Sequence, residues 1–397
     1  MPPAELPFTR AEYAARLDRV RAEMAARGVD TLLVSAPEGM CYLHGYTARW
    51  YRAHSSTHYP PLAVTVVRAG EPGLLHLDFA RERELLAATS LVDDAACYEL
   101  ALYDGDGAGA IDQVAATLAA RGWLAGTVGL ELGSSVPNRA VSEQVQAALV
   151  AHGATSFVDA TAVLRVVRRV KSAAEIALLE RAATAADAGL TRLWSTLEPG
   201  RTELELWAEL VGAMVAAGGE PAASHELVTR GGLGLGHALS GRARIRPGDT
   251  VIADPCGVVH RYHANTCRTF SVGPGDAGDV REQRIAGGAV AVLCEVATAG
   301  TPYGVVNRAL QEYYREHGVW QDCLWAGGYE LGLSLPPDWV GEDGFDVAAL
   351  DDERLVEAGT VTSFHSNFRL PYVDTVVFGA DGTRALSTLP RELLVAA

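Results

Sequence analysis

The chain has 397 residues, of which 49% are hydrophobic and 21% are charged. This composition is typical of a globular protein with buried cores and excludes a chain that is disordered throughout. The 49 acidic residues outnumber the 33 basic ones, and the net charge is −16. Because an acidic surface repels phosphate groups and anionic lipids, we expect neither nucleic acid nor a membrane as a partner. The length favours two domains.

The sequence favours a cytoplasmic protein. No apolar run approaches the roughly 18 residues that a membrane span requires, and the charged N-terminus does not resemble a signal peptide. The cysteines are scattered, without a C-x-x-C pair, and we interpret them as reduced thiols. They are Cys41, Cys97, Cys256, Cys267, Cys294 and Cys323.

Residues 1–165 alternate helix and strand signals. A capping box of Thr9 and Glu12 opens a predicted helix that runs to Gly28. Apolar runs predict strands at 31–37, 62–67, 73–78 and 127–132, and helices are predicted near 110–121 and 141–152. This alternation indicates a layered α/β domain.

The pattern changes at a basic stretch near residue 165. Two further capping boxes, Ser172 with Glu175 and Thr202 with Glu205, open the next predicted helices. The remaining predictions are strands at 225–232, 249–255 and 265–273, helices at 281–299 and 303–317, and strands at 359–368 and 372–379. Helices and strands in separate groups indicate an α+β domain with an antiparallel sheet over residues 166–397.

His237 follows a glycine-rich bend at 231–236, whose spacing does not match a dinucleotide-binding loop. Loops of this kind often carry function, and an imidazole can exchange protons near neutral pH. His237 is therefore a candidate for proton transfer. The alternative is a structural histidine.

Asp254 ends one predicted strand and Asn265 begins the returning strand. The connection is long enough for a hairpin, so we expect the two side chains to face each other. The alternative is that Asp254 only caps a turn. His260 and His263 lie three residues apart and cannot both reach one ion from an extended strand, so we interpret them as loop residues.

Three motifs carry a resemblance to a known superfamily: V-K-S-A-A-E-I at 170–176, R-P-G-D-T-V-I-A-D at 246–254 after His237, and N-T-C-R-T-F at 265–270. The chain resembles the pita-bread metallopeptidase and creatinase superfamily, which includes prolidase, aminopeptidase P, methionine aminopeptidase, creatinase and ectoine hydrolase. The opening segment looks most like ectoine hydrolase and creatinase. The resemblance implies an α/β creatinase-like N-terminal domain, residues 1–165, and an α+β pita-bread catalytic domain, residues 166–397.

The metallopeptidases of this superfamily hold their metal ions with two Asp, one His and two Glu. The resemblance places these positions at Asp254, Asn265, Tyr329, His365 and Val373. Only Asp254 matches the family type, and a single carboxylate cannot neutralise and bridge two divalent ions. We therefore predict most metal ligands to be lost and the pocket to hold no metal and no other cofactor. A single weak metal site at Asp254 and His365 is the alternative.

The creatinase pattern implies roles for further positions. The catalytic histidine of creatinase matches His237, and two glutamates that hold its cationic substrate match Cys267 and His365. Loss of both acids disfavours a strongly cationic substrate, because burying an unpaired cation is costly. A thiolate at Cys267 beside an imidazolium would be an activated nucleophile, and the alternative is a small buried residue on a core strand. The predicted pocket is completed by Tyr329, Asn265 and Asp254.

The stretch Arg49-Trp50-Tyr51-Arg52 lies in the N-terminal half. In creatinase, an aromatic residue and an arginine from this region reach the active site of the neighbouring subunit, so the resemblance implies a homodimer. We expect Arg49 or Arg52 to clamp a substrate carboxylate, with Trp50 or Tyr51 packed over the substrate. The alternative is an ordinary surface loop.

Together these features predict a metal-independent hydrolase that cleaves a non-peptide C–N bond in a small carboxylate-bearing molecule. One alternative is a metal-independent lyase or isomerase of secondary metabolism that uses His237 and His365 as an acid and base pair. Another is a non-catalytic relative that binds a small molecule or a protein with the same pocket.

Overall fold

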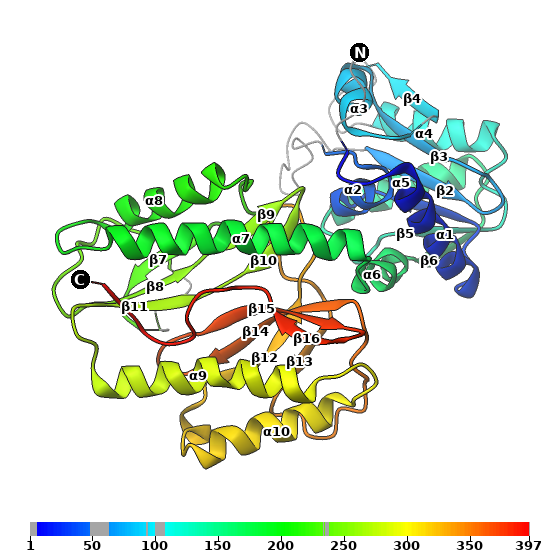
Figure 1. The fold of residues 1–397 in the computed structure, drawn as a ribbon. Coiled ribbons are helices and arrows are strands. Elements are labelled where there is room, and N and C mark those ends of the chain that lie inside the picture. The colour runs from blue at the N-terminus through cyan, green and yellow to red at the C-terminus, as the bar shows by residue number, and fades with distance from the viewer. Residues whose placement is uncertain are drawn as a thin grey trace. The chain divides into compact units, whose positions relative to one another are not determined.

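The computed structural model describes residues 6–47, 63–92, 94–99, 108–232, 234 and 238–396. The chain divides into two compact units, Met1–Arg168 and Arg169–Ala397, here called the N-terminal unit and the C-terminal unit. Figure 1 shows a layered α/β arrangement in the first and two sheets with long helices in the second. No helix among the described residues is both long and apolar enough to span a bilayer.

A six-stranded mixed sheet forms the centre of the N-terminal unit, in the order β4-β3-β2-β1-β5-β6. Its strands are β1 Thr31–Val34, β2 Val64–Arg68, β3 Leu74–Phe79, β4 Asp94–Tyr98, β5 Thr127–Leu130 and β6 Ser156–Asp159. Apolar runs predicted the four inner strands, which are mostly buried. The two edge strands, β4 and β6, were missed because exposed residues interrupt their apolar pattern.

Helices cover this sheet: α1 Arg10–Ala26, α2 Pro37–His44, α3 Arg83–Thr89, α4 Ala108–Ala120, α5 Arg139–Ala151 and α6 Thr161–Arg169. The Thr9 hydroxyl caps α1 by accepting the backbone N–H of Glu12, and Gly28 follows the helix at a φ of 66°. Helix α6 occupies the basic stretch near residue 165. Its buried residues include Val163 and Leu164, so this stretch is packed rather than an open connection.

The C-terminal unit contains a four-stranded sheet, a five-stranded sheet and a two-stranded hairpin. The four-stranded order is β17-β11-β8-β7, the five-stranded order is β13-β12-β14-β15-β16, and the hairpin is β9–β10. The strands are β7 Leu227–Arg230, β8 Thr250–Asp254, β9 Cys256–Val259, β10 Tyr262–Asn265, β11 Arg268–Val272, β12 Trp325–Glu330, β13 Gly344–Asp346, β14 Thr360–Asn367, β15 Val373–Gly379, β16 Gly382–Ala385 and β17 Leu394–Ala396.

Four long helices cover these sheets: α7 Ala173–Thr196, α8 Glu203–Ala216, α9 Ala277–Val296 and α10 Tyr303–Glu316. Both predicted capping boxes form, at the starts of α7 and α8. Leu193 and Leu210 of these helices pack with Phe270 of the four-stranded sheet. Leu293 and Leu310 of α9 and α10 pack in a second core with residues of the five-stranded sheet. Each helix pair therefore covers one sheet (Figure 1).

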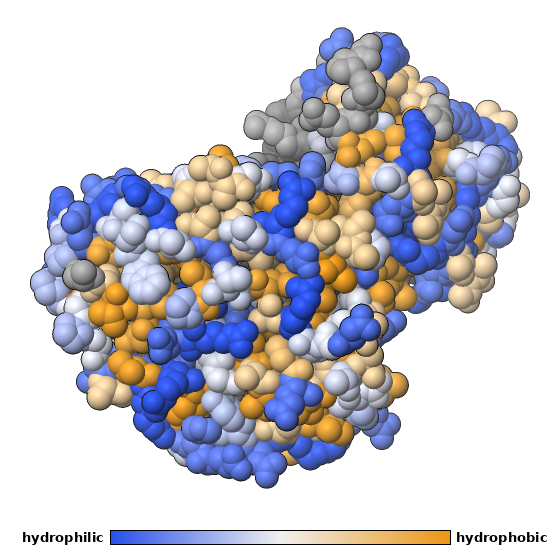
Figure 2. All heavy atoms as spheres, viewed as in Figure 1, coloured by the Kyte–Doolittle hydropathy of each residue, from blue (hydrophilic) through white to orange (hydrophobic). Residues whose placement is uncertain are grey.

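Helix α10 illustrates how the outer layer of the C-terminal unit is built. Its buried residues include Val306, Leu310 and Tyr314, at the spacing of one helix face. Figure 2 shows mainly hydrophilic side chains over α10 and more hydrophobic ones in the region between α7 and α9. The helix therefore presents an apolar stripe to the core and a polar surface outward.

Candidate functional site

Strand β14 divides its side chains between a core face and a site face. Phe364 is wholly buried in the core with α9 and α10. Because successive side chains of a strand point to opposite faces, Ser363, His365 and Asn367 lie on the other face. This face carries the polar residues of the candidate site.

The neighbouring strand β12 places aromatic side chains on both sides of His365. Gly327 lies directly opposite His365 in the register, and Tyr329 lies opposite Ser363. Because Gly327 has no side chain, the His365 ring occupies the space between Trp325 and Tyr329, with centroid distances of 5.0 Å to each ring. Gly327 therefore makes room for an imidazole between two aromatic rings.

The opposite wall contains Asp254, at the end of β8, and Asn265, at the end of β10. The Asn265 Nδ2 donates to Asp254 Oδ1 at 2.8 Å and to the Pro255 carbonyl at 3.1 Å. The connection between the two residues is itself the hairpin β9–β10. The two side chains therefore face each other, as the sequence predicts.

A hydrogen-bonded chain joins the two walls. The Asn265 Oδ1 accepts from the Ser363 hydroxyl at 2.9 Å and from the Tyr329 hydroxyl at 3.4 Å. The Ser363 Oγ also lies 3.1 Å from His365 Nε2. Burial raises the pKa of Tyr329 well above its usual range, so this hydroxyl stays protonated. The structure therefore brings together four predicted site residues: Asp254, Asn265, Tyr329 and His365.

Cys267 begins the return of the chain into β11, and its side chain is 1% exposed. It packs with Ile252 and Val373, and its backbone N–H donates to the Val373 carbonyl. Burial and the nearby Asp254 charge raise the pKa of the thiol well above its usual range. These observations favour the alternative of a small buried residue on a core strand.

The two histidines of the β9–β10 hairpin have different places. His260 lies in the turn, with a φ of 48°. His263 lies on β10, so its interpretation as a loop residue was wrong; the apolar residues beside it form a strand. Its Nε2 accepts the Ala223 backbone N–H, its Nδ1 donates to the Arg261 carbonyl, and burial lowers its pKa to about 3. His263 is therefore a buried structural histidine.

Five predicted site residues lie outside the described residues: His237, Arg49, Trp50, Tyr51 and Arg52. The described chain before the arginine-containing stretch is held in the N-terminal unit. There the Tyr46 hydroxyl donates to Asp78 Oδ2 at 2.5 Å, and both residues are buried.

The residues at the five metal-ligand positions do not fit a dinuclear metal centre. Val373 has no donor atom in its side chain. The Asn265 amide presents its N–H, not its oxygen, to Asp254, so the two side chains do not offer two oxygens to one ion. Within the part of the chain that the structure describes, no three His, Cys, Asp or Glu side chains are grouped to hold a metal.

The sequence interpretation missed three residues of this site: Ser363, Asn367 and Trp325. Ser363 and Asn367 lie two residues on either side of His365, so the two-residue period of a strand was the available signal. The Trp339 Nε1 donates to the Tyr329 hydroxyl at 3.3 Å. Trp339 follows the Leu-Pro-Pro turn in an irregular segment before β13, and its place after that turn is the signal that suggests a residue of the pocket rim.

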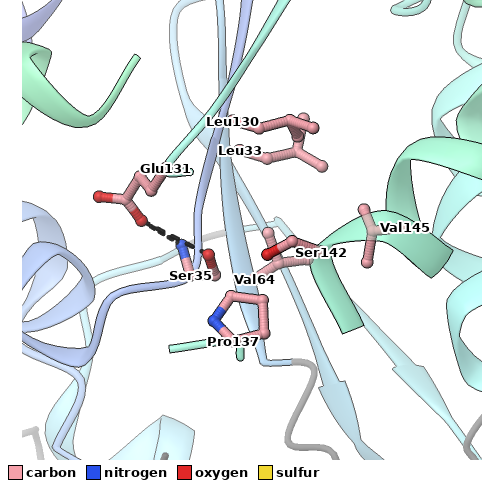
Figure 3. A pocket seen from close by; sticks show the side chains of 8 residues that line it. All are labelled: Leu33, Ser35, Val64, Leu130, Glu131, Pro137, Ser142 and Val145. Atoms are coloured by element: carbon pink, nitrogen blue, oxygen red, sulfur yellow. Dashed lines mark hydrogen bonds between the residues drawn. The ribbon is translucent and has the colours of Figure 1, made fainter. Parts of the chain in front are cut away.

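A small cavity of about 20 Å³ lies in the N-terminal unit, near the ends of β1 and β5 (Figure 3). The Glu131 Oε2 accepts the backbone N–H groups of Ser35 at 2.7 Å and Ala36 at 2.8 Å. These two N–H groups belong to the N-cap residue Ala36 and to the residue before it, so Glu131 fixes the chain where it enters helix α2. Burial raises the pKa of Glu131 to about 7. The cavity has room for about one water molecule, so we do not consider it a substrate site.

Comparison with known proteins agrees with both units. Residues 177–381 match the metallopeptidase family M24, and residues 16–170 match the creatinase/prolidase N-terminal domain. The ectoine hydrolase of Halomonas elongata is 28% identical over 407 residues, and the alignment covers 98% of each chain. The probable dipeptidase PepE of Mycobacterium tuberculosis is 27% identical over 403 residues, again covering 98% of each chain.

Solved structures share the two-domain architecture. The dipeptidase of Pyrococcus horikoshii has a TM-score of 0.78 at 19% identity, over 96% of this chain and 99% of that one. The predicted fold, an α/β creatinase-like N-terminal domain and an α+β pita-bread C-terminal domain, is confirmed. The relatives that match over nearly their whole length include a hydrolase and dipeptidases, which identifies this protein as a hydrolase-type enzyme. The chain therefore belongs to metallopeptidase family M24 and carries the creatinase/prolidase N-terminal domain.

Proposed function

We propose that this protein is a metal-independent hydrolase of a non-peptide C–N bond in a small carboxylate-bearing molecule. The observation that carries the proposal is the hydrogen-bonded chain at the positions that match the family's metal ligands. In it an amide, Asn265, holds Asp254, and Ser363 connects that amide to His365. The similarity to an ectoine hydrolase supports the same proposal.

In the proposed mechanism, His237 is the general base that takes a proton from an attacking water and later returns it to the leaving nitrogen. The Tyr329 hydroxyl donates a hydrogen bond to the oxygen on which negative charge develops. Its present bond to Asn265 is long, at 3.4 Å, so turning toward a substrate costs little. The Asp254 carboxylate orients the donor groups of the substrate.

We propose water, rather than the Cys267 thiolate, as the attacking group. A thiol with a raised pKa is protonated at neutral pH and is a poor nucleophile. The Cys267 side chain is also enclosed by Ile252 and Val373. Its place in the mechanism is then to fill space under the substrate, where creatinase carries an acid.

We also propose that the Arg49–Arg52 stretch binds the substrate carboxylate, with Arg49 or Arg52 as the bidentate donor and Trp50 or Tyr51 as the covering ring. In this proposal the stretch serves the neighbouring subunit of a homodimer. The six free cysteines support a cytoplasmic location, where thiols remain reduced.

A lyase or isomerase is less well supported by the geometry. It would need His365 as an acid or base toward substrate. Both ring nitrogens of His365 lie within hydrogen-bond distance of protein groups, Ser363 at 3.1 Å and Asn367 at 3.4 Å. His237 would therefore have to supply most of the proton transfer alone.

A metal-dependent dipeptidase is the competing candidate, because dipeptidases are among the relatives. One experiment separates it from our proposal. The purified protein is incubated with small carboxylic acids that contain linear amide, cyclic amide or amidine groups, and with Xaa-Pro dipeptides. Each mixture is assayed by mass spectrometry with EDTA, and with added manganese or cobalt.

We expect hydrolysis of at least one small molecule, unchanged by EDTA and lost in His237→Ala. Cleavage of a dipeptide that requires manganese or cobalt would contradict the proposal. Binding of a small acid in a thermal-shift assay, without turnover of any compound, would instead identify a non-catalytic relative. Ser366→Ala, on the core face of β14, is the matched variant that should keep full activity.

A further inference from the structure

The orientation of the Asn265 amide is determined by its neighbours. Its Nδ2 lies near two oxygens that only accept hydrogen bonds, Asp254 Oδ1 and the Pro255 carbonyl. A reversed amide would bring its own oxygen against both acceptors. The Asn265 oxygen therefore faces Ser363 and Tyr329.

This orientation determines the direction of the next hydrogen bond. A serine hydroxyl has one hydrogen, and the Ser363 hydrogen is used at 2.9 Å by the Asn265 oxygen. At the 3.1 Å contact with His365 Nε2, the Ser363 oxygen can then only accept. His365 must therefore carry a proton on Nε2.

The second ring nitrogen of His365, Nδ1, faces the side-chain amide of Asn367. The Asn367 Nδ2 lies 3.4 Å from His365 Nδ1 and donates to it while that nitrogen is unprotonated. Within the described structure, the Asn367 Oδ1 is buried without a hydrogen-bond partner.

We propose that Ser363 is a positioning residue that fixes His365 as the Nε2–H tautomer, with the unprotonated Nδ1 beside the Asn367 amide. The tautomer follows from the geometry of the C-terminal unit alone. Its importance for catalysis rests on the proposed function, in which Ser363 connects the Asn265 amide to His365. Sequence patterns do not assign any role to Ser363 or Asn367.

Nuclear magnetic resonance of the full-length protein tests the tautomer directly. Histidine is labelled with 15N, and long-range 1H–15N correlations are recorded without substrate across the neutral range. The His365 signals are identified by their loss in His365→Gln. We expect the shift pattern of a protonated Nε2 and an unprotonated Nδ1. A wild-type His365 with its proton on Nδ1 would overturn the proposal, whatever the variants do.

Three variants separate positioning from general packing. Ser363→Ala should yield averaged nitrogen shifts of two exchanging tautomers, whereas Ser363→Thr keeps a hydroxyl and should keep the wild-type pattern. Ser366→Ala removes the same atom on the core face of β14, where Ser366 meets the Tyr314 hydroxyl at 2.7 Å. It should leave the His365 pattern unchanged. An unchanged pattern in Ser363→Ala would also overturn the proposal.

Kinetics give a separate readout once a substrate is known. Ser363→Ala should lower kcat by about 10-fold and change its pH profile, with KM nearly unchanged. The Thr variant should recover the wild-type profile. If the tautomer is as expected but the protein hydrolyses nothing, the proposed function fails and the positioning role stands. If hydrolysis is observed and Ser363→Ala has the wild-type pH profile, the catalytic part of this inference fails.

Discussion

Two aspartates of the C-terminal unit accept a hydrogen bond of the same length but differ in what surrounds them. Asp374 accepts at 2.8 Å from Arg268, and both side chains are wholly buried. Asp254 accepts at 2.8 Å from the neutral amide of Asn265 and is only partly buried. A guanidinium cancels the charge of its partner, whereas an amide holds a carboxylate in place without neutralising it. The first arrangement is suited to stability and the second to an interaction with a ligand.

The surroundings of Arg268 make this contrast sharper. Its five N–H groups all have acceptors, which are Asp374, the Ser387 hydroxyl and the carbonyls of Pro390, Cys267 and Val373. Two of these carbonyls belong to residues at predicted site positions. Arg268 therefore ties β11 to β15 behind the site and leaves no donor for a substrate.

The largest expected effect is the removal of this cation. Arg268→Met should destabilise the C-terminal unit by about 3–5 kcal/mol, because Asp374 would remain buried without its partner. Arg391 lies 3.6 Å from the same carboxylate but is 38% exposed. Arg391→Met is the matched control and should cost at most about 1 kcal/mol. Urea denaturation measures both, and equal losses would contradict the distinction.

Glu131 is a third case, a buried carboxyl that accepts from the backbone N–H groups of Ser35 and Ala36 and from the Ser35 hydroxyl. Its pKa in the folded protein, about 7, lies above the ordinary 4.5. The folded state therefore binds the proton more tightly, so the stabilisation that is present below pH 4.5 is lost as the pH rises through 7. From pH 5 to pH 8 the free energy of unfolding of the wild-type N-terminal unit should fall by about 3 kcal/mol.

Glu131→Gln isolates this contribution, because glutamine keeps an acceptor for the Ser35 and Ala36 N–H groups. The variant should be more stable than wild type at pH 8 and similar to it at pH 5. Thermal denaturation at several pH values gives the comparison. If the wild type and the variant respond identically to pH, the carboxyl does not titrate as described.

Replacing the neutral amide beside Asp254 with a carboxylate should place two negative charges next to each other. Asn265→Asp places a second carboxylate at the position of the 2.8 Å contact, so the pair must share a proton or bind a cation. We expect a loss of about 1–3 kcal/mol at pH 8 that recovers as the pH falls. Manganese or magnesium should also restore the stability of this variant while leaving wild type unchanged. A difference in stability between this variant and wild type that is the same at pH 5 and pH 8 would count against this interpretation.

The smallest expected effect on stability comes from Asp254→Asn. Because this side chain is only partly buried and its partner is neutral, the free energy of unfolding should change by about 1 kcal/mol or less. Under the proposed function, activity should nevertheless be lost, since this change removes the only carboxylate at the five positions that match the family's metal ligands. Denaturation of the variant tests the expected stability, and an assay of the same preparation tests the expected loss of activity. A severe loss of stability would place Asp254 with Asp374 as a structural residue.

Patterns of residues that lie close together in the sequence predicted the fold well. The capping boxes at Ser172 and Thr202 depend on residues three positions apart, and both form. Helix α2 and the edge strands β4 and β6 were missed. The N-cap residue of α2 is Ala36, whose side chain cannot accept a hydrogen bond, so the polar N-cap signal that marks α1, α7 and α8 is missing.

In the candidate site, too, nearby residues predicted one feature, whereas a residue far away in the chain determines another. The length of the connecting hairpin predicts that Asp254 and Asn265 face each other. The structure contains the hydrogen bond between them. The environment of Cys267 depends on Val373, which is more than a hundred residues away in the chain. An apolar enclosure of this kind, and the thiol pKa that follows from it, cannot be inferred from the residues around Cys267.

The alternation of β14 also limits how this site can change in evolution. Deleting or inserting one residue in the strand would exchange its faces, sending His365 toward the α9–α10 core and Phe364 toward the site. Insertions and deletions in β14 would therefore be tolerated only when they add or remove two residues. New chemistry is more easily acquired by exchanging side chains at fixed positions on an unchanged backbone.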